Sequence, residues 1–461
     1  RSFADTSGRL KASPRSREYY FREGVSWSKI GSGRFSPRYT EPGFIFDDTG
    51  QSAFPQEGQS VLMLAGLLCS VTSDYFLSFL SHTLSFNKGD IERIPFPDSL
   101  EYDTEVASEA ISVARADWDS YETSWDFTTL PLLRPEHRQA TLAATYAHLR
   151  AYWQTMTDEM KRLEEENNRI FIDAYGLQDE LTPDVLLHEI TLTCNPHYRY
   201  GAGKTERDYE ERLLADTIRE FISYAVGCMF GRYSLDKPGL VLANAGEGVE
   251  NYINKVAGGA VQDTISFMPD RDNVIPILDG EWFADDIVDR FKRFLRVTFG
   301  EEHNEENLEF IEKALGASLR SYFLREFYDD HVKRYQKRPI YWLFSSSNGS
   351  FNALIYMHRY RTDTVSVVLN EYLRDFQNKL AAHRSHLERV SVSAAAMPRD
   401  KTAALKEIDK VEKAIAELAE YEREVLYPLA TQQVAIDLDD GVKVNYNKFG
   451  KALRKVKSLS V

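Results

Sequence analysis

The sequence is poor in the residues that build disulfide, metal and nucleotide sites. Its three cysteines, Cys69, Cys194 and Cys228, lie far apart and form no Cys-x-x-Cys pair, so the pattern indicates neither a disulfide framework nor a zinc site, and reduced thiols are expected. The ten histidines are scattered without a metal-binding spacing. Neither the Gly-x-Ser-x-Gly nucleophile motif nor a nucleotide P-loop occurs. From these absences we predict no catalytic residue and no metal ligand in this chain.

Long apolar runs are also missing. No stretch of about 18 apolar residues exists, so no membrane-spanning helix is predicted. Residues 1–6 contain neither Met nor the apolar core of a signal peptide, which indicates an internal start in a longer protein. Together with reduced thiols, this predicts a cytoplasmic location and no membrane partner. At 461 residues, of which 43% are hydrophobic and 28% charged, the chain is long enough for about two to four packed units.

Positive charge is scarce in the whole chain but concentrated at its start. The formal net charge is -15, yet residues 1–40 hold nine Lys or Arg against three acids, a local charge of about +6. The nine basic residues are Arg1, Arg9, Lys11, Arg15, Arg17, Arg22, Lys29, Arg34 and Arg38. Such a face attracts phosphate where the rest of the surface repels it. We therefore interpret residues 19–97, which open with interleaved aromatic and basic residues, as a nucleic-acid reader.

The hydrophobic pattern predicts an α+β chain. Turn residues after Tyr19 indicate short strands, including residues 44–46, and a spacing of three and four predicts one helix over 61–80. Residues 138–171 carry one apolar stripe about nine turns long, which needs a partner of matching length near the other end of the chain. Residues 401–427 carry a heptad seam that favours a long antiparallel pair, with an independent homodimeric coiled coil as the alternative.

A β-hairpin is predicted over residues 338–361. Alternating apolar residues flank Asn348-Gly349, a favoured two-residue turn. Basic residues stand at both ends of its strands: Lys333, Arg334, Lys337, Arg338, Arg359 and Arg361. They would either grip a duplex backbone or protect the solvated edge of the sheet.

Three further motifs have a structural alternative. Residues 195–198, Asn-Pro-His-Tyr, differ at one position from the Asn-Pro-Pro-Tyr of amino-methyltransferases, but no strand with a Gly-x-Gly turn precedes them, which favours a structural or DNA-contacting loop. Arg199 and Lys204 follow among aromatics and glycines, and would contact phosphates or bases unless this loop packs on its neighbours. Residues 437–441 lack the spacing and final Glu of a calcium loop, so a turn between short strands is predicted there.

Several segments together resemble a known family. They are residues 19–28, 38–39, 43–47, 67–70 and 86–95, with further similar segments at 195–201, 337–346 and 437–446. In combination they resemble the C-terminal half of a PglX-type adenine-specific DNA methyltransferase of the bacteriophage-exclusion (BREX) system. The resemblance covers nearly the whole chain.

The resemblance implies an S-adenosylmethionine-dependent enzyme that marks host DNA at adenine N6, with double-stranded DNA and other phage-defence proteins as partners. The first half of such enzymes holds the cofactor fold and an Asn-Pro-Pro-Tyr motif, neither of which this sequence contains, so the chain is expected to bind no cofactor and to be inactive alone. Residues 1–134 would form a β-rich DNA target-recognition domain, truncated at its start. Residues 135–461 would form a helical spacer and DNA-clamping domain with long antiparallel helices and the hairpin.

The resemblance and the charge pattern together predict a DNA-binding set. Its members are Lys29, Arg34, Ser36, Arg38, Arg199, Lys204, Lys337 and Arg338. Two other functions fit the same sequence, namely part of a combined restriction-methylation enzyme and a protein-interaction scaffold of a defence complex.

If Arg34 and Arg38 touch bases, replacing either with Ala should weaken duplex binding by roughly 1–3 kcal/mol. An equilibrium titration with labelled duplex measures this change. Unchanged affinity in both variants would move the site elsewhere, first to Arg199 and Lys204.

Overall fold

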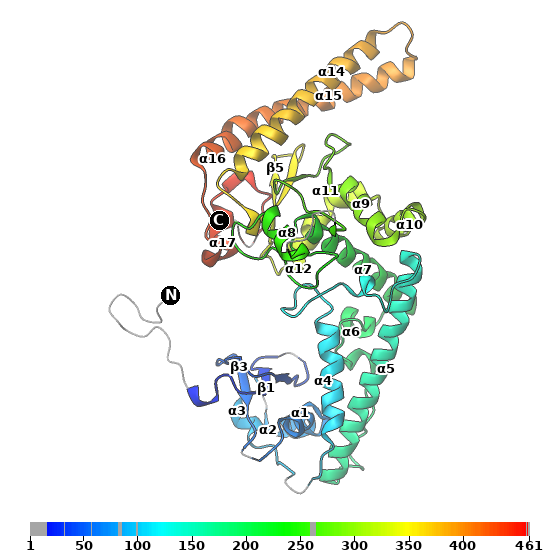
Figure 1. The fold of residues 1–461 in the computed structure, drawn as a ribbon. Coiled ribbons are helices and arrows are strands. Elements are labelled where there is room, and N and C mark those ends of the chain that lie inside the picture. The colour runs from blue at the N-terminus through cyan, green and yellow to red at the C-terminus, as the bar shows by residue number, and fades with distance from the viewer. Residues whose placement is uncertain are drawn as a thin grey trace, which may run out of the picture. The chain divides into compact units, whose positions relative to one another are not determined.

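The chain forms two compact units, which are drawn in Figure 1. The structure, a computed structural model, describes residues 16–31, 33–56, 58–81, 85–97, 100–258, 264–457 and 459. Unit 1 comprises residues 1–118 and 151–204, and unit 2 comprises residues 119–150 and 205–461. This division by contacts is not a single cut after residue 134. The functional division at that point stays a prediction, while the mixed α+β class is confirmed.

Unit 1 contains a three-stranded antiparallel sheet backed by helices. Strand β1 (Gly24–Ser28) lies between β2 (Arg38–Thr40) and β3 (Gly50–Ala53). Its inward side chains, Val25 and Trp27, pack with apolar residues of the two helices that follow, α1 (Val61–Cys69) and α2 (Val71–Leu80). The prediction of a strand at residues 44–46 is wrong, because this segment is irregular.

The single helix predicted over residues 61–80 is also wrong, because the chain breaks at Ser70. The axes of α1 and α2 differ by 67°. Ser70 is extended, and its hydroxyl donates to the carbonyl of Leu67 at 2.7 Å, which stabilises the break. Apolar spacing continues across such a break, so periodicity alone does not reveal it. Among the described residues no single helix is long and apolar enough to cross a membrane, although α1 and α2 counted together would pass that test.

The long helix α5 (Leu142–Tyr175) begins in unit 2 and continues through unit 1. Within unit 1, Tyr175 of α5 contacts Phe76 of α2 edge-on, and Phe171 stacks on Tyr102, just before α4, with ring centroids 5.4 Å apart. These contacts are with neighbouring elements rather than with the C-terminal helices that the sequence analysis favours as its partner. The other helices of unit 1 are η1 (Arg17–Tyr19), α3 (Lys88–Ile91), α4 (Thr104–Trp118), η3 (Leu187–Glu189) and α6 (Pro196–Tyr200).

Unit 2 is mainly helical around a small sheet. The predicted hairpin is confirmed: β5 (Tyr341–Ser345) pairs antiparallel with β6 (Asn352–Tyr356), and β4 (Ile275–Pro276) adds to β6. Nearly every hairpin residue is buried, so both faces are covered and the predicted alternation of inner and outer residues does not hold. The surrounding helices are η2 (Pro131–Leu133), α7 (Glu206–Met229), α8 (Val249–Ala257), α9 (Ile287–Phe299), α10 (Asn304–Leu315), α11 (Leu319–Arg325), α12 (Phe327–Arg334) and η5 (Met357–Arg359).

The predicted antiparallel pair is formed by α14 (Arg374–Val392) and α15 (Pro398–Tyr421), which lie side by side in Figure 1. At its base both helices pass through π-helical turns, and Arg374 donates to Glu422 at 2.7 Å between them. The flanking elements are α13 (Thr364–Val367), η6 (Val368–Leu373), η7 (Glu422–Leu426), α16 (Tyr427–Gln432), η8 (Leu438–Asp440), α17 (Gly441–Asn447) and η9 (Gly450–Ala452).

The turn between strands predicted at residues 437–441 is wrong, because this segment starts helical structure. The Asp437 carboxylate accepts the backbone N–H of Asp439 at 3.0 Å and so caps η8. The acidic residues of this segment therefore match the preference of helix starts for side-chain oxygens.

A buried histidine, His331, lies beside the hairpin in unit 2. Nε2 of His331 accepts the backbone N–H groups of Ile340 and Tyr341 at 3.2 and 3.0 Å, which requires a neutral ring. Burial, with the charges of Arg334 and Arg232, holds the pKa of His331 well below its usual range. Burial likewise lowers the pKa of His358 to about 4.

We predict that the free energy of unfolding falls as the pH drops below about 6.5, because the unfolded histidine takes up a proton that the folded one refuses. In His331→Gln the side chain does not titrate. The wild type should be more stable at pH 8, and its advantage should shrink by up to about 1.4 kcal/mol per pH unit below 6.5. Denaturant titrations at pH 8, 6.5 and 5 measure this, with the exposed His386→Gln as control. An advantage that stays constant would contradict the prediction.

Candidate nucleic-acid interface

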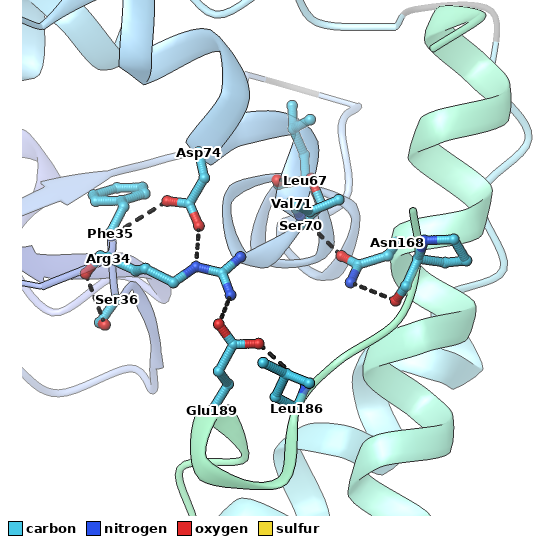
Figure 2. Close-up of polar contacts among 11 residues, drawn as sticks. Arg34, Phe35, Ser36, Leu67, Ser70, Val71, Asp74, Asn168, Leu186 and Glu189 are labelled. Carbon is cyan, nitrogen blue, oxygen red and sulfur yellow. Dashed lines mark hydrogen bonds and ion pairs between the residues drawn. The ribbon is translucent and has the colours of Figure 1, made fainter. Parts of the chain in front are cut away.

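The predicted DNA contact Arg34 is held by two carboxylates, as Figure 2 shows. Its Nε donates to Asp74 on α2 at 2.7 Å, and its Nη1 donates to Glu189 in η3 at 2.6 Å. Asp74 also accepts the backbone N–H of Phe35 at 3.3 Å. Arg34 therefore fastens the loop between β1 and β2 to two other elements of unit 1. The sequence predicts Arg34 as a DNA contact, but in the structure two carboxylates already bind its guanidinium.

The two ion pairs of Arg34 with Asp74 and Glu189, which we call the Arg34 clamp, contribute little stability. Partial burial lowers the pKa of Arg34, but the hydrogen bond and charge of Asp74, together with those of Glu189, outweigh burial and raise it. Burial raises the pKa of Asp74 in spite of Arg34. Because the Arg34 side chain is 49% exposed, solvent screens the pair, and such pairs contribute at most about 1 kcal/mol.

The remaining predicted contacts near β1 and β2 differ in how free they are. Lys29 forms an ion pair with Asp48 at 3.0 Å, and the exposed Ser36 hydroxyl donates to the carbonyl of Arg34 at 3.2 Å. Arg38 is exposed, and its Nη1 donates only to the carbonyl of Pro37 at 2.9 Å. Within the described part of the chain, no carboxylate forms an ion pair with Arg38. Arg38 is therefore the predicted contact whose charge is most available to a phosphate.

The predicted cationic face is only partly present in the described residues. Four of its nine basic residues, Arg1, Arg9, Lys11 and Arg15, lie outside them. In residues 16–40 five basic residues face two acids, a surplus of three, and Glu41, Asp47 and Asp48 follow at once and cancel it. Glu41 also pairs with Arg115. Counting charges along the chain therefore overstates the positive field of this region.

A titratable acid lies near the same loop. Burial raises the pKa of Glu164 on α5 to about 7, against the opposing charges of Arg34 and Arg38. The cations of the loop thus share their surroundings with a carboxyl group that is partly neutral at physiological pH.

The Asn195 motif is a helix cap. Asn195 is fully buried, its Nδ2 donates to the carbonyls of Leu187 and Ile190 at 2.7 and 2.9 Å, and its Oδ1 accepts the backbone N–H of His197 at 3.1 Å. The amide oxygen thus caps α6, while the amide nitrogen joins this start to η3 and the residue after it. The neighbouring Lys204 donates to the carbonyls of Tyr200 and Gly201 and closes its own loop.

Arg199, from the same predicted set, is half-buried, and its guanidinium lies over the ring of Tyr200, 5.7 Å from the centroid. The ring of its chain neighbour therefore lies beside the group that was predicted to contact DNA.

Of the basic residues around the hairpin in unit 2, Lys337 and Arg338 are exposed and remain candidates. Arg334 and Arg359 are not, which corrects their predicted place at a duplex grip. Arg334 lies between Glu122 at 3.3 Å and Glu220 at 3.8 Å, and the buried Arg359 donates to the carbonyl of Phe230. A buried cation requires polar partners, and Arg334 and Arg359 have theirs within the protein.

One feature at this face is missed by the sequence analysis, where Phe21, Phe44 and Ile45 serve only as parts of family segments. All three are exposed and meet at one turn of unit 1, because the Phe21 N–H donates to the Phe44 carbonyl at 2.9 Å. The only sequence signal is the apolar run of residues 44–46 after Pro42-Gly43, and such a run does not distinguish exposed from buried side chains. For the described residues, no group of three or more His, Cys, Asp or Glu is arranged to hold a metal.

Comparison with known proteins gives two relatives and no matching family model. The chain is 37% identical to the adenine-specific methyltransferase BrxX of Escherichia coli O9:H4 (strain HS), over 98% of the chain and 38% of the relative. It is 36% identical to the adenine-specific methyltransferase PglX of Lacticaseibacillus casei (strain Zhang), over 96% of the chain and 35% of the relative. The chain is a homologue of part of these methyltransferases. It spans little more than a third of their length, and the similarity supports the resemblance found from the sequence.

Asn168 on α5, also drawn in Figure 2, joins two other segments of the same unit. It is 6% exposed, its Oδ1 accepts the N–H of Val71 at 2.8 Å, and its Nδ2 donates to the carbonyl of Pro183 at 3.2 Å. Removing it would leave the part-buried N–H of Val71, at the start of α2, without its partner.

We predict that Asn168→Ala lowers the free energy of unfolding by about 1–3 kcal/mol, because it removes two hydrogen bonds of a buried side chain and leaves their backbone partners unsatisfied. Arg34→Ala should cost at most about 1 kcal/mol because its ion pairs are half exposed. Denaturant titrations of both variants compare the two, and a larger loss for Arg34→Ala would contradict this ranking.

Proposed function

We propose that this chain is the DNA-recognition and C-terminal portion of a site-specific N6-adenine DNA methyltransferase of a BREX phage-defence system. The observation that carries the proposal is the similarity to two adenine-specific methyltransferases over 96–98% of the chain. Because the chain spans little more than a third of either relative, methyl transfer would be an activity of the whole protein. Double-stranded DNA and other proteins of the defence complex would be its partners.

Within this proposal the residues near β1 and β2 have separate tasks. Arg34 would position the loop through Asp74 and Glu189, while Arg38 and Ser36 would contact DNA. In unit 2 the exposed Lys337 and Arg338 would bind phosphates. Phosphate contacts supply affinity without reading sequence, and a few side chains at base edges supply the choice of site.

The methyl donor of such an enzyme would be S-adenosylmethionine. Cofactors of this nucleotide type bind at the carboxyl ends of parallel strands, beside a glycine-rich turn into a helix. Every strand pair among the described residues is antiparallel. These residues therefore do not fit the cofactor, and we assign its site to the remainder of the whole protein.

A scaffold role is the second candidate, and the α14–α15 pair favours it. Val392, Met397 and Leu405, toward the connection between the two helices, are 80%, 65% and 59% exposed. Two helices alone bury little apolar surface, so these residues would suit contact with another protein of the complex.

The proposal predicts that the 461-residue chain binds duplex DNA with an affinity that falls roughly tenfold or more between 50 and 200 mM salt, because phosphate binding releases counterions. Fluorescence anisotropy with a labelled duplex of about 30 base pairs measures this. No binding at 50 mM salt would favour the scaffold.

Arg38→Ala should weaken duplex binding by about 1–3 kcal/mol if its side chain reaches a base edge. Arg169→Ala, which removes an exposed arginine of α5 in the same unit, is the matched control. Equal losses in both variants would show that only overall charge matters and would remove Arg38 from the site.

A further inference from the structure

Exposed apolar side chains gather at one turn of unit 1. Phe21, Phe44 and Ile45 are 63%, 58% and 65% exposed, and we call them the apolar ridge. Two backbone hydrogen bonds join its two segments: the Phe21 N–H donates to the Phe44 carbonyl at 2.9 Å, and the Gly43 N–H donates to the Phe21 carbonyl at 3.1 Å. Single exposed apolar residues are common, whereas three on the two joined segments of one turn make a candidate binding surface.

The backbone of Phe21 is strained. Its φ is 65°, in the left-handed region that bulky residues rarely adopt, at a cost of about 1–3 kcal/mol. A glycine would occupy this position without strain. Phe21 therefore stands where glycine would fit better, and its exposed ring does not stabilise the core.

An aromatic layer lies against the Phe21 end of the ridge. Tyr20 contacts both Phe21 and Phe46 edge-on, and Phe46 packs against Phe54 with centroids 5.4 Å apart. Phe54 in turn stacks on Tyr19 at 5.0 Å. Phe21 thus rests against a layer of packed rings, which suits a side chain that must keep its position when it contacts a partner.

Two cations flank the ridge along the chain. Arg22 follows Phe21 directly, and its guanidinium lies over the ring of Tyr19, 5.2 Å from the centroid. Arg38 opens the strand that leads into the turn at Gly43. Among the residues that the structure describes, neither arginine forms an ion pair with a carboxylate. A protein partner would leave both cations unpaired unless it brought acids of its own, whereas DNA brings phosphates at every step.

We propose that the apolar ridge inserts between base pairs of duplex DNA, with Arg22 and Arg38 on the adjoining phosphates. This inference rests on the proposed function. Phe and Ile are residue types that proteins use as wedges to unstack and kink a base step. An enzyme that modifies adenine must take the base out of the stack, which leaves a gap that an apolar side chain can fill or widen. The ridge would therefore be a residue set that deforms the substrate for the reaction.

The test uses two labelled duplexes of equal sequence, one intact and one with a single abasic site, because a wedge prefers a step that is already open. The wild-type chain should bind the abasic duplex at least about fivefold more tightly, which is the lower end of the stacking effect of one aromatic ring. Phe21→Gly and Phe44→Ala should lose most of this preference. Phe79→Ala, which removes a ring 60% exposed on α2 of the same unit, should keep it.

A thermal melt of each variant separates insertion from folding. Phe21→Gly relieves the positive φ and should melt no lower than the wild type, so a lost preference cannot be attributed to unfolding. If the wild type binds neither duplex, the proposed function fails. If it binds both equally, or if Phe21→Gly keeps the preference, the wedge alone is overturned. A ridge variant that changes only sedimentation would assign the ridge to a second copy of the chain and would also overturn the wedge.

Discussion

Two adjacent asparagines of α5 join this helix to the segments around the break between α1 and α2. Asn167 donates to the carbonyl of Gly66 at 2.9 Å and accepts the hydroxyl of Tyr102 at the same distance, while Asn168 accepts the first N–H of α2. A side chain at Gly66 would meet the Tyr102 hydroxyl at 2.4 Å, so only glycine allows this approach. The break between α1 and α2, and with it the direction of the helix that carries Asp74, depends on these bonds. The loop bearing Arg34 takes its position from that helix.

Patterns that repeat along the chain were predictable, and contacts between distant segments were not. The hairpin and the α14–α15 pair each follow from local spacing of apolar residues. The break at Ser70 depends partly on a distant side chain, because Asn168, 97 positions along the chain from Val71, accepts the Val71 N–H. The left-handed backbone at Phe21 could not be predicted, because glycine is the usual sequence signal for that conformation and phenylalanine stands there instead.

Charge shows the same limit in the candidate site. The basic residues near the start of the chain could be counted from the sequence, but their partners could not. Asp74 and Glu189 are 40 and 155 residues from Arg34, and Asp48 reaches Lys29 across the sheet. A cluster of one sign in the sequence therefore becomes a mixed surface once folding brings distant acids to it. Only when the ion pairs of Lys29 and Arg34 are known does Arg38 differ from them, as an arginine that forms no ion pair among the described residues.

The loop and the ridge are held by different kinds of interaction, and this gives them different roles. The Arg34 clamp consists of half-exposed ion pairs, which salt screens, and the attraction of Arg38 for phosphate is screened in the same way. The ridge rests on backbone hydrogen bonds and aromatic packing, on which salt has little effect. Ionic conditions would therefore govern whether DNA is held, while the shape of the ridge would govern what happens to a base step once it is held. Affinity and deformation would thus be separable properties of one small surface.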